Sequence, residues 1–278
     1  MQLSRRDTLG LVAATTLLGA VGRPAGAQAA ALPVANMEVV LKAAQWDPTK
    51  LDEAITPGAG PSVLLVEKAL QAKGFLDAKY VDGHFGTTTV SAYAAYQRSL
   101  GYSGLGATGL PGKTSLTKLG TGRFTVDHLL TPGARTTYQG MTVNERTVAM
   151  IKAARTKYTG PFTLSQGSYN PGGDPSSAGT HDGGGVIDIA AVSLSGSQRT
   201  ALVKALRQVG FAAWLRTPAQ ADWPYHVHAV AISDTDMAAP AVKQVGDYYE
   251  GKNGLASHAA DDGPKVTKVT YEEYLRSI

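Results

Sequence analysis

The sequence predicts an α+β fold. Apolar residues at helical spacing, followed by helix-ending glycines, dominate residues 59–120, whereas residues 124–250 alternate two capped helices with short apolar runs typical of strands. We therefore expect a small three-helix domain, followed by a second domain with mixed helices and an antiparallel sheet.

The composition fits a globular protein without disulfide bonds and gives no support to nucleic-acid binding. Of the 278 residues, 43% are hydrophobic and 17% are charged, and the absence of Cys excludes disulfide bonds. Without residues 1–29, which hold three Arg and one Asp, the net charge falls from +4 to +2. With so little basic excess and no long basic run, nucleic-acid binding has no support.

The N-terminus has the features of an export signal. Arg5 and Arg6 precede an apolar stretch over residues 9–21, and residues 27–29 (Ala-Gln-Ala) fit a cleavage site. The stretch is too short for a permanent membrane helix, so we expect no transmembrane segment in the mature chain. The twin arginine indicates the Tat route, which predicts a secreted, periplasmic or cell-wall-associated protein with residues 1–29 removed.

The next segments can be assigned in chain order. Residues 30–58 are rich in Ala and Pro, which predicts a linker with one short helix near residues 37–44. Apolar periodicity then predicts helices over residues 63–70, 87–100 and 113–119, the first two ended by glycine. These three helices make up the expected domain at residues 59–120.

This domain resembles the three-helix peptidoglycan-binding domain. The matching residues are Val66 to Leu70, Gly74, Phe75, Val81-Asp82-Gly83, Phe85-Gly86, Thr89, Ala92, Tyr96-Gln97, Gly101, Gly109, Thr114 and Leu119. The turn Asp-Gly-x-Phe-Gly between two helices is the most specific part of the match. The resemblance implies that peptidoglycan is the partner and that this domain anchors the protein to the cell wall. A generic helical subdomain is the alternative.

The second domain begins with helix signals. Thr142 and Glu145 form a capping-box pattern before one helix, and Ser195 and Gln198 form another before a helix that Gly210 ends. The β-like runs are residues 162–166, 185–190, 212–215 and 225–232. The last segment, residues 251–278, has two alternatives: a flexible tail, or a packed helix near its end.

Two segments of this domain predict a metal site. His181 is followed by three glycines and Asp188, and His226-x-His228 lies on a predicted strand, where residues two apart share a face. The Gly-rich loop allows the chain to return Asp188 beside His181. Asp188 interrupts the apolar run Val-Ile-Asp-Ile-Ala, and a buried carboxylate is costly unless it is paired or bound to metal. Two His and a carboxylate, without Cys, suit catalytic zinc with an open position.

Each of these residues also has a simpler explanation. His181 could cap the Gly-rich loop, Asp188 could pair with Arg216, and His226 and His228 could form a half-exposed strand face. Their coincidence in one domain favours the metal site.

The motifs resemble zinc peptidases that cut peptidoglycan peptides. Ser177-Ala178-Gly179-Thr180-His181-x6-Asp188 and His226-x-His228 are similar to the motifs of D-alanyl-D-alanine carboxypeptidases and dipeptidases, L-alanyl-D-glutamate endolysins and the penicillin-insensitive murein endopeptidase, whose fold hedgehog signalling domains share. The resemblance covers residues 125–235. It implies zinc on His181, Asp188 and His228.

The chain departs from that family at two positions. Many members have an acidic residue three positions before the last zinc ligand, where this chain has Tyr225, so His226 and Asp222 are the alternatives for the general base. His226 is favoured because it shares the strand face of the ligand and histidine titrates near neutral pH. The family also has an Arg before the first motif, where Gln166 is the nearest polar residue. Gln166 or Tyr225 would then donate to the oxyanion.

The sequence therefore predicts a secreted zinc metallopeptidase acting on peptidoglycan stem or cross-bridge peptides, with D,D or L,D specificity left open. A non-catalytic zinc-containing wall-binding protein is the alternative, and a wall amidase with similar ligands is a third. An acidic residue within reach of the zinc would favour the enzyme, and a fourth protein ligand without a cleft would favour the binding protein.

Overall fold

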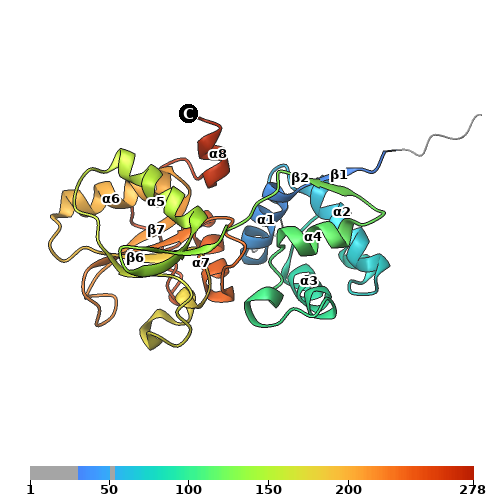
Figure 1. Ribbon diagram of the computed structural model, residues 1–278, viewed down its shortest axis with the longest axis horizontal. Helices are drawn as coiled ribbons and strands as arrows, with labels where there is room; N and C mark the ends of the chain where they lie inside the picture. The colour runs from blue at the N-terminus through green and yellow to red at the C-terminus, as the bar shows by residue number, and fades with distance from the viewer. Residues whose placement is uncertain (1–30, 51–53) are drawn as a thin grey trace, which may run out of the picture. The chain divides into compact units, whose positions relative to one another are not determined.

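The computed structural model describes residues 31–50 and 54–278. The predicted export signal, residues 1–29, lies outside the described residues. Residues 32–278 form one compact unit that holds both helices and sheets, which confirms the α+β fold class (Figure 1). The division into domains at 59–120 and 124–250 stays a prediction. Within the described residues, no helix is both long and apolar enough to cross a membrane.

Helices dominate the first part of the described chain. They are α1 (Met37–Trp46), α2 (Gly60–Ala72), α3 (Thr87–Ser99) and α4 (Lys113–Gly120). The last three lie where the periodicity predicts them. The segment expected to be a linker with one short helix near residues 37–44 does hold a helix there, α1, which the Asn36 side chain caps. This helix is not a linker element, because its Met37, Val40 and Leu41 are fully buried. Burying such side chains contributes about 1.5 to 3 kcal/mol each, so α1 belongs to the core.

Two buried carboxylates hold the turn between α2 and α3. Glu67 accepts hydrogen bonds from the backbone N–H of Asp82 and Gly83 and from the Thr89 hydroxyl. Asp47 accepts from the backbone N–H of Phe85 at 3.0 Å. The Asp-Gly-x-Phe-Gly turn is therefore fixed through its own backbone N–H groups, which side chains from outside the turn satisfy.

A four-stranded antiparallel sheet forms the centre of the second part. Its order is β5 (Leu164–Gln166), β6 (Val186–Ala190), β8 (His226–Ala231) and β7 (Phe211–Arg216). All four overlap the predicted β-like runs. Two smaller sheets were not predicted: β1 (Val34–Asn36) pairs with β2 (Thr125–Asp127), and β3 (Arg135–Tyr138) pairs with β4 (Met141–Asn144).

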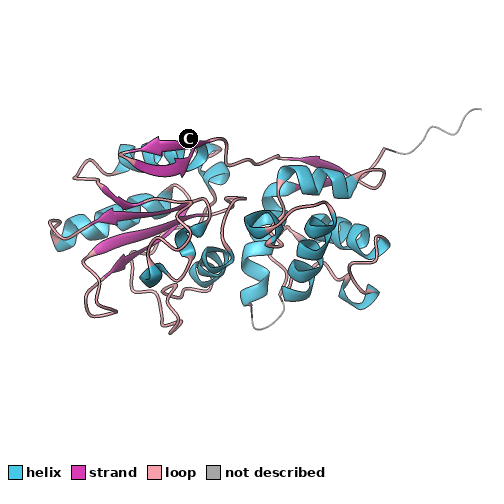
Figure 2. Cartoon of the chain, turned by 60° about the horizontal axis from the view of Figure 1, so that its bottom comes forward, coloured by secondary structure: helices cyan, strands magenta, loops and turns pink. Residues whose placement is uncertain are grey.

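Helices cover the two faces of the main sheet unequally (Figure 2). On one face, α5 (Glu145–Lys157) and α6 (Gly196–Gln208) pack on the apolar side chains of alternate strand residues, including Ile187 and Val227. On the other face, α7 (Ala239–Tyr249) packs against Val230 and its neighbours. Because alternate residues point to opposite faces, Asp188 and His228 lie on the α7 face.

The capping boxes were predicted with mixed success. Ser195 caps α6 and its partner Gln198 accepts from the Ser195 backbone N–H, as predicted. The box at Thr142 was wrong: Thr142 lies in β4 paired with Thr137, and Asn144 is the residue whose side chain caps α5. The Thr142 backbone is held by the hairpin, so the helix begins at Glu145 and its cap lies two residues after Thr142.

The C-terminal segment is packed, not a flexible tail. Its helix α8 (Tyr271–Leu275) begins with a capping box between Thr270 and Glu273. The buried Arg207 holds Asp261 in a two-pronged ion pair, with nitrogen–oxygen distances of 2.8 and 2.9 Å. The short 3-10 helices of the described residues are η1 (Asp47–Thr49), η2 (Ala78–Tyr80), η3 (Gly104–Ala107), η4 (Pro175–Ser177) and η5 (Thr180–Asp182).

Candidate metal centre

One row of paired residues crosses the main sheet at the site. Asp188 of β6 pairs directly with Gln166 of β5 and with His228 of β8, and His228 pairs with Trp214 of β7. Directly paired residues project from the same face of a sheet. The register therefore brings Gln166, Asp188 and His228 together on the α7 face, and His226, two residues before His228, shares that face.

The Gly-rich loop returns the chain from His181 to this row. His181 lies in η5 and Asp188 in β6, with Gly183, Gly184 and Gly185 between them. A Cβ on Gly184 would lie 2.6 Å from the Tyr169 hydroxyl oxygen, and Gly185 has a φ of +79°. Glycine is needed here both for the turn and because residues packed against the loop leave no room for a side chain.

His181 presents one buried nitrogen that no hydrogen bond uses. Its Nδ1 lies 2.7 Å from the backbone carbonyl oxygen of Gly167, so Nδ1 carries the proton and donates it. Its Nε2 is buried without a hydrogen-bond partner and lies 3.3 Å from Oδ2 of Asp188. A buried lone pair with no donor is unusual and has a natural use as a metal ligand.

His228 presents the opposite nitrogen. The Gln244 side chain donates from Nε2 to the Gly254 carbonyl at 3.0 Å, so its Oε1 faces His228 and accepts from Nε2 of that ring at 2.8 Å. A neutral His228 therefore has its lone pair on Nδ1, which lies 2.8 Å from Oδ1 of Asp188. Two acceptors at that distance need a proton or a cation between them.

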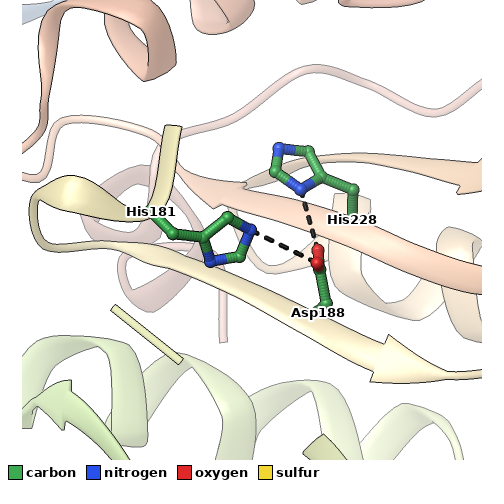
Figure 3. Close-up of side chains that lie close together, drawn as sticks. All are labelled: His181, Asp188 and His228. Atoms are coloured by element: carbon green, nitrogen blue, oxygen red, sulfur yellow. Dashed lines mark hydrogen bonds and ion pairs between the residues drawn. The ribbon is translucent and has the colours of Figure 1, made fainter. Parts of the chain in front are cut away.

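These three side chains could hold a metal ion. His181 and His228 point at Asp188 from two elements (Figure 3), and one ligand atom from each of the three lies within 4.8 Å of the others. In a tetrahedral site with bonds of about 2.0 to 2.2 Å, ligand atoms are roughly 3.3 to 3.6 Å apart. The His181–Asp188 separation of 3.3 Å meets that requirement without rearrangement.

Electrostatics favour an ionised carboxylate at the centre. Burial by itself would raise the pKa of Asp188, but the neighbouring His228 and His181 outweigh it and hold that pKa well below its usual range. Burial lowers the pKa of His228 in spite of Asp188, which favours the neutral ring. Burial acts the same way on His181, but the nearby Asp188 carboxylate outweighs it and raises the pKa of that ring. A metal cation between Asp188 and the two histidines would take the place of the proton that Asp188 favours on His181.

His226 lies beside the group but is not part of it. Its Nδ1 donates to the Pro224 carbonyl oxygen at 2.9 Å, which leaves the lone pair on Nε2. That Nε2 is 3.9 Å from Oδ2 of Asp188. The side chain is 16% exposed, so His226 presents a basic nitrogen to solvent next to the three ligand candidates.

The group lies in a cavity of about 610 Å³, which His226, Gln166 and Tyr225 also line. The Gln166 Nε2 is buried without a hydrogen-bond partner, so it is an unused donor. The Tyr225 ring stacks under the Arg199 guanidinium, 3.7 Å from its centroid. Asp222 is exposed and is not among the residues that line the cavity, so the structure gives it no link to the site.

Among the cavity residues that were not assigned to the site from the sequence, three bear on its chemistry. They are Asp174, Arg216 and Gln244. No local motif marks Asp174 or Gln244, because both reach the cavity only through the tertiary fold. Arg216 was considered as a partner for Asp188, but Asp188 pairs with histidines, and the described residues show no ion pair between it and Arg216. Asp174 is the second acidic residue of the cavity, besides Asp188, and hydrogen bonds from Ser176 lower its pKa.

Comparisons with known protein families, with curated proteins and with solved structures each found no match to this chain.

Proposed function

We propose that this protein is a secreted zinc-dependent peptidase that cleaves the stem or cross-bridge peptides of peptidoglycan. The observation that carries the proposal is the buried His181–Asp188–His228 group in a cavity that also holds a histidine with a free lone pair. Two nitrogens and one carboxylate oxygen are a ligand set of hydrolytic zinc sites, which keep a fourth position open. When bound, zinc supplies a Lewis acid that polarises a carbonyl and makes water acidic.

His226 is the general base of this proposal. Its Nε2 takes a proton from the attacking water and delivers it to the leaving amine, while the Pro224 carbonyl keeps the ring in the required tautomer. Asp174 is a weaker base because the hydrogen bonds from Ser176 stabilise its charged form. Asp222, the other base that the sequence suggested, is not proposed, since it does not line the cavity.

Gln166 is the proposed donor to the oxyanion that develops on the scissile carbonyl. The Gln166 Nε2 has no hydrogen-bond partner, so donating to a substrate would break no existing bond. Gln166 also pairs with Asp188 across the two strands, which places it beside the ligand candidates. Such a preorganised donor typically contributes about 3 kcal/mol to the transition state. Tyr225 remains a contact for the substrate along the cavity wall.

The helical domain at residues 59–120 is the proposed wall anchor. A second cavity of about 500 Å³ borders α3 and α4, and Tyr102 and Lys113 line it. An aromatic ring and a cation beside a cleft suit a polar, anionic polymer such as peptidoglycan. Together with the predicted twin-arginine signal, this cavity supports the proposal that the protein acts at the cell wall.

The test measures metal content and peptidoglycan cleavage together, for the parent, for His226→Ala and for His128→Ala. His128 is an exposed histidine outside the cavity, so it controls for loss of any imidazole. We expect one zinc per chain in all three, and cleavage at least about 100-fold slower in His226→Ala alone.

Other outcomes discriminate among the alternatives. Loss of zinc in His226→Ala would make His226 a ligand. Binding to peptidoglycan with one zinc and no cleavage of any stem peptide would identify the non-catalytic wall-binding protein, and release of the stem peptide from the glycan would identify an amidase. A parent without metal would refute the site.

A further inference from the structure

The cavity contains a buried cation that the proposed reaction does not use. Arg216, the last residue of β7, is only 2% exposed, and it lines the same cavity as His226. Arg216 pairs directly with His226 across the strands, so both side chains project from the α7 face.

The Arg216 guanidinium has unused donors. One terminal nitrogen donates to the Asn253 carbonyl at 2.7 Å, and the other makes a longer 3.5 Å contact to the Gly254 carbonyl. A guanidinium carries five N–H groups, so three have no protein acceptor among residues 31–50 and 54–278. No carboxylate in that part of the chain forms an ion pair with Arg216.

A buried cation without a counter-ion is costly for the fold. Burial lowers the pKa of Arg216 to about 10, and the charges of Asp188, Asp262 and Asp261 only partly oppose it. Asp188 is already shared by the surrounding histidines, and its charge would be taken up by a bound metal. An anion that enters the cavity and meets the free N–H groups of Arg216 would therefore gain a charge-assisted, two-pronged contact.

We propose that Arg216 binds a carboxylate of the substrate, so that the enzyme acts on peptides with a free carboxylate close to the scissile bond. The assignment rests on the proposed peptidase function. Its position follows from the register: Arg216 is next to His226, and His226 Nε2 is 3.9 Å from Asp188. Arg216 on β7 thus lies at the opposite edge of the sheet from Gln166 on β5.

Two carboxylates of a stem peptide have this chemistry. One is the terminal carboxylate of a D-alanyl-D-alanine end, and the other is the free carboxylate of a D-glutamyl residue. Three synthetic peptides separate them: one with a free terminal carboxylate, the same peptide as its C-terminal amide, and an amidated peptide with a D-glutamyl carboxylate beside the scissile bond.

The first measurement is kcat/KM for these peptides with the zinc-loaded parent, Arg216→Met and Arg216→Lys. We expect the parent to prefer one carboxylate peptide over the amide by about 10- to 100-fold, and we expect Arg216→Met to lose that preference, so that its rates on the two peptides become similar. If Arg216 only holds the loop at residues 253–254, Arg216→Met will slow all three peptides by the same factor, which would overturn the proposal. Arg216→Lys keeps the positive charge but lacks the planar pair of N–H donors, so it should retain part of the preference for the carboxylate peptide.

A binding measurement does not depend on turnover or on a stable Arg216 variant. The affinities of N-acetyl-D-alanyl-D-alanine, its amide and the amidated D-glutamyl peptide are measured by calorimetry on zinc-loaded His226→Ala. Tighter binding of a carboxylate peptide than of the amide, without cleavage of any peptide by the parent, would support the Arg216 assignment and refute the peptidase. Cleavage of all three at equal rates with equal affinities would refute the assignment and leave the peptidase standing.

Discussion

At the scale of single residues, hydrogen bonds to each ring decide which nitrogen a histidine presents. Backbone carbonyls hold the Nδ1 proton of His181 and of His226, so both rings present Nε2. Gln244 holds the Nε2 proton of His228, which therefore presents Nδ1. Three histidines of similar chemistry thus take defined and different orientations around Asp188, and a metal ligand needs such support to be positioned.

Gln244→Leu should weaken metal binding. The change removes the acceptor that fixes the His228 tautomer, and loss of such a supporting contact typically costs about 10- to 100-fold in metal affinity. Competition with a chelating indicator dye measures the zinc affinity. Gln71→Leu is the matched control, because Gln71 is exposed on α2. Equal affinities in the two variants would show that Gln244 does not support the metal ligand.

At the scale of elements, the strand register does most to build the site. The alternation of residues along a strand was enough to predict that His226 and His228 share a face. It was not enough to predict that Gln166 pairs with Asp188, because pairing between strands is decided by the whole sheet. Gln244 and Arg216 were missed as site residues for the same reason, since helix α7 and strand β7 meet the site only after folding.

Local signals failed where two elements compete for one segment. Thr142 and Glu145 match a capping box, but the hairpin of β3 and β4 takes up the Thr142 backbone, and Asn144 becomes the cap. Strands as short as β1 and β2 leave no periodicity to detect, and their pairing joins segments about ninety residues apart. The longer helices and the four strands of the main sheet were predictable because their apolar patterns match their burial.

Gly184→Ala should loosen the loop that carries His181. The added Cβ would meet the Tyr169 hydroxyl oxygen at 2.6 Å and the Asn144 side chain at 2.9 Å, so the loop must shift. Overpacking of this kind costs about 1 to 3 kcal/mol, and we expect weaker metal binding with it. Thermal unfolding with and without zinc measures both effects. Gly196→Ala is the control because nothing lies within 4 Å of its added Cβ, and a similar loss there would contradict this explanation.

Glu67 should make the turn between α2 and α3 sensitive to pH. Burial raises the pKa of Glu67 to about 7 from 4.5, so the folded chain binds this proton more tightly than the unfolded chain. Its contribution to stability is therefore largest at low pH and falls as the pH rises from 4.5 to 7.

The test compares the parent with Glu67→Gln, whose amide cannot ionise. Urea unfolding at pH 5 and pH 8 should show the parent losing on the order of 2 to 3 kcal/mol relative to the variant across this interval. Since all other groups titrate in both proteins, the difference isolates Glu67. Parallel pH profiles would show that its hydrogen bonds from Asp82, Gly83 and Thr89 offset burial completely.

At the scale of the whole molecule, the C-terminal segment completes the wall of the cavity. Three successive carbonyls, those of residues 252, 253 and 254, accept from Trp214, Arg216 and Gln244. These donors come from the sheet face and from α7, which also carry or support the metal ligands. Residues 251–278, for which the sequence allowed either a flexible tail or a packed helix, are therefore coupled to the site. The coupling runs through side chains that line the cavity.

The buried ion pair between Arg207 and Asp261 helps to hold the same segment to the core, and Asp261→Ala should be strongly destabilising. Arg207 is 2% exposed and donates to both Asp261 oxygens, and its Nε donates to the Ala213 carbonyl. Removing the carboxylate leaves a buried, uncompensated cation, which typically costs about 3 to 5 kcal/mol. Urea unfolding measures the loss, with the exposed neighbour Asp262→Ala as control.

A second variant separates the ion pair from the packing of the segment. In Arg207→Met with Asp261→Ala, no charge is left buried, so the double variant should be more stable than Asp261→Ala alone even though it lacks both partners. That result would show that the penalty comes from the unpaired guanidinium. If the double variant is less stable than Asp261→Ala, the arginine stabilises the fold mainly through its contacts with the carbonyls of Ala213 and Pro264, and the segment depends on those contacts instead.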